Sequence, residues 1–193
     1  MTKVLLTGFE PFGTATSNPS GEIVKQISGD NIVTAILPVA YAQSAERLLA
    51  LIAEHNPDVV ICLGQAEGRT QISPEKVAIN LDDARLADNE GVLRNDVKIL
   101  EGGPDAYFST LPVKEIVDAI KTAGVPAAIS LSAGAFLCNH VFYVAQNKFA
   151  GTNVRSGFVH VPLMDSQAPE FPGLPTMPLD QMVIAVRAML GVL

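Results

Sequence analysis

The chain has 193 residues, of which 48% are apolar, and it carries a net charge of −7. This length and apolar content suit one well-packed domain spanning residues 1–193. Lys and Arg are not clustered, which argues against nucleic acid and anionic membranes as partners, because both require concentrated positive charge. Only 17% of the residues are charged, so we expect an apolar part of the surface to be covered by partner subunits.

The N-terminal sequence MTKVLLTGFEPFG predicts a strand rather than a signal peptide, because its apolar run ends early in Gly, Glu and Pro. The most apolar stretch, 126–145, is interrupted by Ser, Asn and His and is a poor membrane span. Two cysteines, Cys62 and Cys138, are too few for a disulfide framework. We therefore expect a cytoplasmic protein with free thiols.

The first third of the chain alternates between strand and helix patterns. Residues 3–9 (KVLLTGF) form a continuous apolar run, as expected for a strand covered on both faces. Ser, Asn and Pro at 17–19 begin a helix that continues to about residue 27. A strand at 32–39, a helix at 42–55 and a buried strand at 58–64 follow.

Residues 65–103 are polar and turn-rich apart from a brief KVAIN, and a segment of this length indicates a functional role. The alternation then resumes with a helix, a strand, a helix, a strand and a closing helix, at 112–123, 126–132, 138–149, 157–163 and 179–190. This order predicts a single-domain layered α/β/α sandwich with a mixed, largely parallel twisted sheet. Ligands in such folds bind beyond the carboxyl ends of the strands.

Cys138 lies in SAGAFLCNH (132–140), after small turn-forming residues and at the expected start of a helix. The amides and dipole of a helix N-terminus lower the pKa of a thiol toward neutrality, and the same amides can bind an oxyanion. A buried structural cysteine is the alternative interpretation, since cysteine is among the most frequently buried residues. Cys62, inside the apolar VVICLG, fits the structural role better.

A cysteine nucleophile needs a base, and the chain has three histidines. His140 is two residues from Cys138, which turns it about 200° around a helix and away from the sulfur. His55 closes a helix, where a cation suits the dipole. His160 lies near the end of a strand and is the best candidate, although a half-buried structural histidine is also possible there.

The third member of a triad holds the imidazole in place, and carboxylates crowd residues 65–90. Spacing does not choose among Glu67, Glu75, Asp82, Asp83, Asp88 and Glu90. The adjacent pair Asp82–Asp83 has no neighbouring histidine, so we expect no metal site.

Phe9 and Phe12, in TGFEPFG, follow the first strand. At the edge of the sheet they can wall an apolar pocket, and a hydrophobic plug under the loop is the alternative. Gly8 and Gly13 do not form the G-x-G-x-x-G pattern of a dinucleotide site.

Six segments occur in the order LLTGFEPFG with NPS, GQAEGR, ISPEKVAIN, DDARLADNEG, AGAFLCNHVFY and GFVHVP. Together, from residue 3 to about residue 167, they resemble the pyroglutamyl-peptidase I (pyrrolidone-carboxylate peptidase) family. The resemblance implies a cytosolic cysteine peptidase that removes an N-terminal pyroglutamyl residue from peptides, uses no cofactor and is commonly a homotetramer. The chain departs from the family pattern at Glu67, Ala87 and Val144.

The resemblance also implies roles for individual residues. The nucleophile falls on Cys138, the base on His160 and the acidic member on Glu75. The pocket for the pyroglutamyl ring and the positions that shape the site fall on Phe9, Phe12, Phe136, Gln65, Asn18, Arg85 and Asp88. Two other readings remain open: a thiol amidase of different acyl specificity and a non-catalytic binding homologue.

Overall fold

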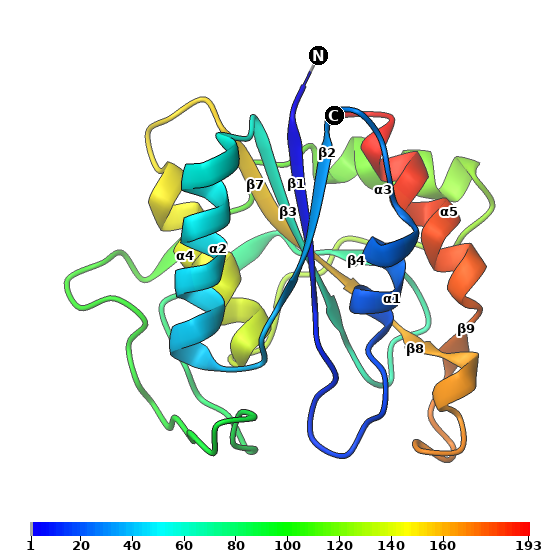
Figure 1. Cartoon of the computed structure of the whole chain (residues 1–193), viewed down its shortest axis with the longest axis horizontal. Coiled ribbons are helices and arrows are strands. Elements are labelled where there is room, and N and C mark those ends of the chain that lie inside the picture. The colour runs from blue at the N-terminus through cyan, green and yellow to red at the C-terminus, as the bar shows by residue number, and fades with distance from the viewer. Residues whose placement is uncertain (1) are drawn as a thin grey trace.

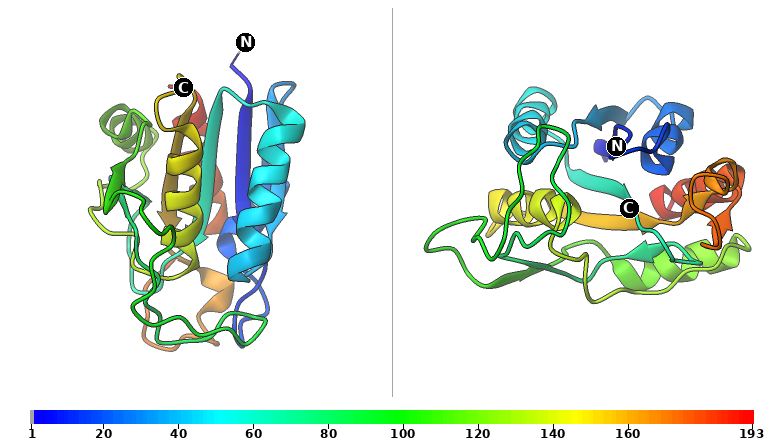
Figure 2. Two further views of the ribbon diagram at one scale, coloured as in Figure 1. Left: turned by 90° about the vertical axis from the view of Figure 1, so that its left-hand side faces the viewer. Right: turned by 90° about the horizontal axis from the view of Figure 1, so that it is seen from below.

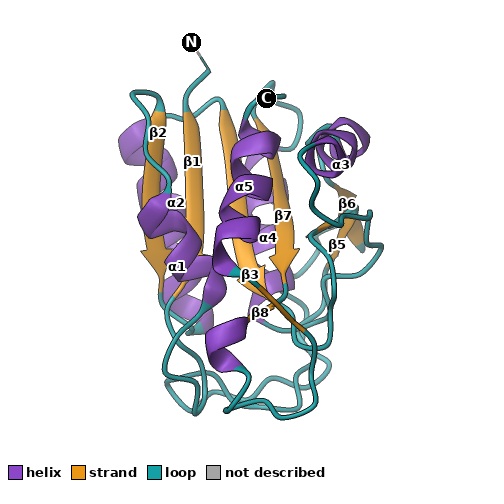
Figure 3. Ribbon diagram, turned by 90° about the vertical axis from the view of Figure 1, so that its right-hand side faces the viewer, coloured by secondary structure: helices purple, strands orange, loops and turns teal. Residues whose placement is uncertain are grey.

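A central five-stranded sheet organises the computed structural model, which describes residues 2–193 (Figure 1). In spatial order its strands are β2 (Ile32–Leu37), β1 (Val4–Phe9), β3 (Val59–Gln65), β7 (Arg155–Val161) and β4 (Ser73–Pro74). The first four are parallel to one another, and the short β4 pairs antiparallel with β7. The prediction of a mixed, largely parallel sheet is therefore confirmed (Figure 3).

Helices cover both faces of the sheet, which confirms the layered α/β/α arrangement (Figures 1 and 2). One face is covered by α2 (Tyr41–His55) and α4 (Leu137–Phe149). The other is covered by α1 (Pro19–Gln26), α3 (Val113–Thr122) and α5 (Leu179–Leu190). No helix within residues 2–193 is both long and apolar enough to cross a membrane.

Strand β3 shows why these sequences form buried strands. Val60 and Cys62 face the core under α2 and α4, while Val59, Ile61 and Leu63 face the opposite core. All five side chains are fully buried. A strand covered on both faces needs apolar residues at successive positions, which explains the unbroken run VVICL.

The prediction of a strand at 126–132 is wrong. The segment makes only isolated parallel bridges, Ile72 to Ala127 and Glu75 to Ser130. Backbone hydrogen bonds flank Pro74: Ala128 donates to Ile72, and Lys76 donates to the carbonyl of Ser130. Proline has no N–H group, so the ladder lacks the bond that residue 74 would donate.

The long segment 65–103 lies largely on the surface, and its middle is tied to the body of the fold. Strand β5 (Val77–Ile79) pairs with β6 (Ala106–Phe108), which the sequence did not predict. After β7 come β8 (Leu163–Met164), the short helix η1 (Asp165–Gln167) and β9 (Thr176–Met177).

Candidate active site

The sulfur of Cys138 lies directly against the backbone of the sheet. Cys138 is the second residue of α4, whose N-terminus meets the carboxyl end of β3. A Cβ atom built on Gly64 would lie 2.8 Å from Cys138 Sγ and 2.6 Å from Phe158 Cζ. Only glycine therefore allows this approach of the sulfur to β3.

His160 lies beside this contact on the neighbouring strand. It pairs in register with Gly64, and residues paired in this way point their side chains to the same face of a parallel sheet. Its ring packs 4.9 Å from that of Phe158, which lies on the face covered by α4. The structure therefore brings the sulfur of Cys138 and the imidazole of His160 together on one face.

Glu75 contacts the imidazole from the opposite side. His160 Nδ1 and Glu75 Oε1 are 2.7 Å apart. The carboxylate accepts this hydrogen bond, so the Nδ1 atom carries the proton and the Nε2 atom is available for proton transfer. Glu75 is fully buried at the end of β4. Of the carboxylates between residues 65 and 90, the fold thus selects Glu75 as the partner of His160.

Arg69 provides the positive charge for this buried carboxylate. Its Nη2 atom lies 2.9 Å from the same Oε1 atom of Glu75, and it also donates to the carbonyl of Ser132 at 3.1 Å. A buried carboxylate without a charged partner would be strongly destabilising. The sequence analysis missed Arg69, because a single arginine in a polar loop carries no local signal of the partner that it meets in the fold.

Burial determines the resting protonation of the site. Burial, with a further contribution from the Glu75 carboxylate, raises the pKa of the Cys138 thiol to about 12, against the opposing effects of Arg69 and of the backbone N–H of Cys138 itself. Burial also lowers the pKa of His160, and its hydrogen bond to Glu75 only partly offsets this. The expectation that the helix N-terminus lowers the thiol pKa toward neutrality is therefore wrong, because desolvation outweighs the helix effect.

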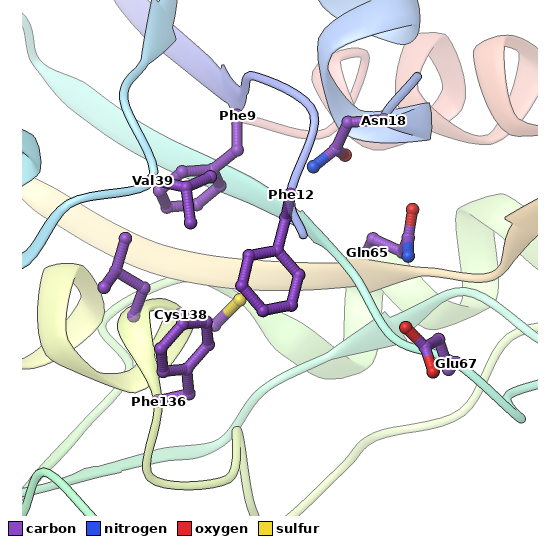
Figure 4. Close-up of a pocket in the computed structure, with 9 residues that line it drawn as sticks. Phe9, Phe12, Asn18, Val39, Gln65, Glu67, Phe136 and Cys138 are labelled. Carbon is purple, nitrogen blue, oxygen red and sulfur yellow. The ribbon is translucent and has the colours of Figure 1, made fainter. Parts of the chain in front are cut away.

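A cavity of about 140 Å³ opens next to the sulfur (Figure 4). The rings of Phe12 and Phe136 pack against each other with centroids 5.2 Å apart. The cavity is lined by Phe9, Phe12, Asn18, Val39, Gln65, Glu67, Phe136, Leu137 and Cys138. The predicted aromatic wall and Gln65 are therefore at the cavity, together with Glu67, one of the departures from the family pattern.

Asn18 lines the cavity and also holds its wall in place. Its Oδ1 atom accepts hydrogen bonds from the Ser20 amide at 3.1 Å and from Ser20 Oγ at 2.7 Å. Its Nδ2 atom donates to the carbonyl of Glu10 at 2.9 Å. The side chain thus caps α1 and fixes the loop that carries Phe12.

Arg85 and Asp88 lie away from this cavity, as far as residues 2–193 define its lining. Arg85 is exposed and borders a second, more open hollow, of which Phe12 and Phe136 also form part. The carboxylate of Asp88 accepts hydrogen bonds from the backbone amides of Tyr41, Glu90 and Val92. Asp88 therefore stabilises the start of α2 and its own loop rather than contacting the cavity.

The two residues after Cys138 anchor the 65–103 segment to α4. Asn139 exchanges hydrogen bonds of 2.9 Å with the backbone of Ile79 and donates to the carbonyl of Leu81. His140 Nδ1 lies 2.9 Å from Asp82 Oδ2, so this ring faces away from the sulfur, as the helix geometry predicted. Cys62 is fully buried inside β3, in agreement with a structural role.

Residues 2–193 contain no group of three or more His, Cys, Asp and Glu side chains arranged to bind a metal ion. The adjacent residues Asp82 and Asp83 do not face a common site. Asp82 bonds to His140 and to Arg94, whereas Asp83 is exposed.

Comparisons with known proteins identify the family of the chain. A sequence model of the family described as pyroglutamyl peptidase matches residues 2–193. The chain belongs to the pyroglutamyl peptidase family. This membership places it among the cysteine-type exopeptidases and confirms the resemblance carried by the six segments.

Family members from several bacteria are similar over nearly their whole length. The pyrrolidone-carboxylate peptidase of Aliivibrio fischeri is 46% identical, over 98% of this chain and 93% of its own. That of Cupriavidus pinatubonensis is 47% identical, over 97% and 90%. The crystal structure of pyroglutamyl peptidase I from Bacillus amyloliquefaciens superposes with a TM-score of 0.94 at 43% identity, covering 98% of this chain and 95% of that one.

Proposed function

We propose that this pyroglutamyl-peptidase family member hydrolyses the bond after an N-terminal pyroglutamyl residue, with Cys138 as nucleophile, His160 as base and Glu75 as the residue that holds the imidazole. The observation that carries the proposal is the position of Cys138 Sγ against Gly64, the register partner of His160. Glu75 bonds to the far side of that imidazole, and the aromatic cavity opens beside the sulfur.

The resting site holds a thiol and a neutral imidazole. Attack therefore begins when the Cys138 proton passes to His160 Nε2 as the sulfur bonds to the carbonyl carbon of the pyroglutamyl residue. The carbonyl oxygen becomes negative, and the free N–H groups at the start of α4 stabilise it. Glu75 stabilises the imidazolium, and Arg69 forms an ion pair with Glu75 within the buried site.

Collapse of this intermediate returns the proton from His160 to the departing amine and leaves a thioester on Cys138. A water molecule then gives a proton to His160 and attacks the thioester. The C–S bond breaks, pyroglutamate leaves and the thiol is restored.

The cavity suits the first residue of such a substrate. A pyroglutamyl residue is a cyclic lactam without an α-amine, so it is uncharged and mostly apolar. Phe9, Phe12 and Phe136 supply apolar walls, and Gln65 supplies a polar contact. Arg85, on the neighbouring hollow, stays a proposed contact to the substrate.

The test compares two cysteine variants on a pyroglutamyl anilide. Cys138→Ala is expected to abolish release of the amine, whereas Cys62→Ala is expected to keep most of the activity, because Cys62 is buried in β3. Prolyl and alanyl anilides, which lack the lactam, are expected to be poor substrates. The reverse result for the cysteines would reject the assignment, and preferred cleavage of another anilide would indicate a different acyl specificity.

We also propose that the protein works in the cytoplasm as a homo-oligomer, a tetramer by analogy with the family. Two free cysteines support a reducing compartment. The low charged fraction and the exposed side chains of Phe108 (70%) and Leu131 (73%) support self-association. Light scattering after gel filtration measures the mass, and a monomer would refute the oligomer.

A further inference from the structure

Gln167 is a buried glutamine whose side chain lies behind the cavity. It ends η1 and is fully buried. Its Oε1 atom accepts a hydrogen bond of 2.9 Å from the Met164 amide. Its Nε2 atom donates to the carbonyl of Ser17 at 3.2 Å and to Gln65 Oε1 at 2.9 Å. The side chain therefore connects β8 and the loop before α1 to a residue of the cavity wall.

The backbone partners fix which way round both amides lie. A side-chain amide can usually be turned over, since its oxygen and nitrogen are similar in shape. Here the Met164 amide can only donate and the Ser17 carbonyl can only accept, so the oxygen of Gln167 faces Met164 and its nitrogen faces Ser17. Because that nitrogen also donates to Gln65, Gln65 must turn its oxygen toward Gln167.

Gln65 consequently presents its amide nitrogen, a hydrogen-bond donor, to the cavity. Its oxygen is engaged by Gln167, and Figure 4 shows its nitrogen on the side where Glu67 lies. The oxygen of Asn18, also on the wall, accepts hydrogen bonds from Ser20, and one N–H of its amide nitrogen donates to the carbonyl of Glu10. The matching group on a ligand is an acceptor, and the pyroglutamyl ring has one in its lactam carbonyl, which a prolyl ring of the same size lacks.

We propose that Gln167 is a positioning residue that fixes the Gln65 amide so that its Nε2 atom donates to the lactam carbonyl of the substrate. This inference rests on the proposed function and adds to it the physical source of selectivity for the lactam. Loss of one such bond while its buried partner remains typically weakens binding by about tenfold.

The first experiment measures kcat and KM on a pyroglutamyl anilide for Gln167→Met, with Gln146→Met as the matched control. Gln146, in the body of α4, is also a buried glutamine, and it donates to the carbonyl of Ser156 in β7 at 2.6 Å. We expect KM to rise about tenfold in Gln167→Met while kcat stays within about twofold of the wild-type value. The reason is that the lost contact binds the substrate equally in the ground state and in the transition state. KM is expected to be unchanged in the control. Equal effects in both variants would overturn the proposal.

Gln65→Glu tests the same idea while preserving the bond from Gln167. The substitution keeps an oxygen for Gln167 Nε2 and replaces the donor on the cavity side by an acceptor. We expect a loss of lactam binding at least as large as in Gln167→Met. The double variant Gln65→Met/Gln167→Met is expected to lose no more lactam binding than Gln65→Met alone, since both substitutions remove the same contact to the substrate. Additive losses would show that Gln167 does not act through Gln65.

Binding of 2-pyrrolidone, the bare lactam ring, separates this inference from the catalytic proposal. We expect the Cys138→Ala protein to bind it in an NMR titration and Gln167→Met to weaken that binding about tenfold, even if no anilide is hydrolysed. Normal turnover by the wild type with unchanged lactam affinity in Gln167→Met would overturn the inference and leave the proposed function intact. A wild-type protein that neither binds the lactam nor hydrolyses the anilide would overturn both.

Discussion

Replacing Gly64 by alanine tests the position of the sulfur against the sheet. The added methyl carbon would lie 2.8 Å from Cys138 Sγ and 2.6 Å from Phe158 Cζ. Non-bonded carbon contacts are normally about 3.5–4.0 Å, so the sulfur must move by about 1 Å. A misplacement of about 1 Å at a reacting group costs about 10²-fold in rate. Overpacking of this kind costs about 1–3 kcal/mol of stability.

The assay is kcat on a pyroglutamyl anilide, with the free energy of unfolding measured in urea on the same preparation. Gly157→Ala is the control, because its methyl group would meet Leu111 and lie 2.6 Å from Ser109 Oγ, on another part of the buried sheet. We expect a similar loss of stability in both variants and the hundredfold loss of kcat only in Gly64→Ala. Full activity in Gly64→Ala, or an equal loss of kcat in both, would refute the reasoning.

Three further predictions concern charge in the site. Burial lowers the pKa of His160. We therefore expect kcat/KM to keep its neutral-pH value at pH values somewhat below the ordinary imidazole pKa of about 6.5. Below that pH the native state binds fewer protons than the unfolded chain, so the free energy of unfolding should fall as the solution is acidified. A loss of activity centred above about pH 6.5 would contradict the assignment of His160 as the base. Arg69→Met removes a cation that lowers the His160 pKa, so the acidic limb of the pH profile should move to higher pH, and an unmoved limb would exclude a role for Arg69 in the site. Since the pKa of the Cys138 thiol is raised to about 12, iodoacetamide should modify the resting protein slowly at neutral pH, and rapid modification would reveal a preformed thiolate–imidazolium pair.

The fold could be predicted from the sequence because its strands are buried on both faces. VVICLG and KVLLTGF are continuous apolar runs, and the turn and cap residues around them mark their ends. The segment 126–132 (PAAISLS) is also mostly apolar, yet its ladder is interrupted by Pro74, which lies far away in sequence. Pairing partners of this kind cannot be read from local pattern.

The site could be predicted in part. Cys138 and His160 stand out locally, by a helix start and a strand end. Glu75 does not, because 85 residues separate it from His160 and only the fold brings the two together; the family resemblance selected it. Arg69 and Gln167 were missed for the same reason. The thiol pKa was misjudged because the helix effect is local, whereas burial depends on the packing of the whole site.

Trapping the acylated protein tests the central claim most directly. The protein is mixed with a pyroglutamyl anilide, quenched in acid within the first turnover and digested, and the peptides are analysed by mass spectrometry. We predict a pyroglutamyl group on the peptide that contains Cys138, and its absence in Cys138→Ala. Acylation of the Cys62 peptide instead, or hydrolysis that continues in Cys138→Ala, would contradict the account.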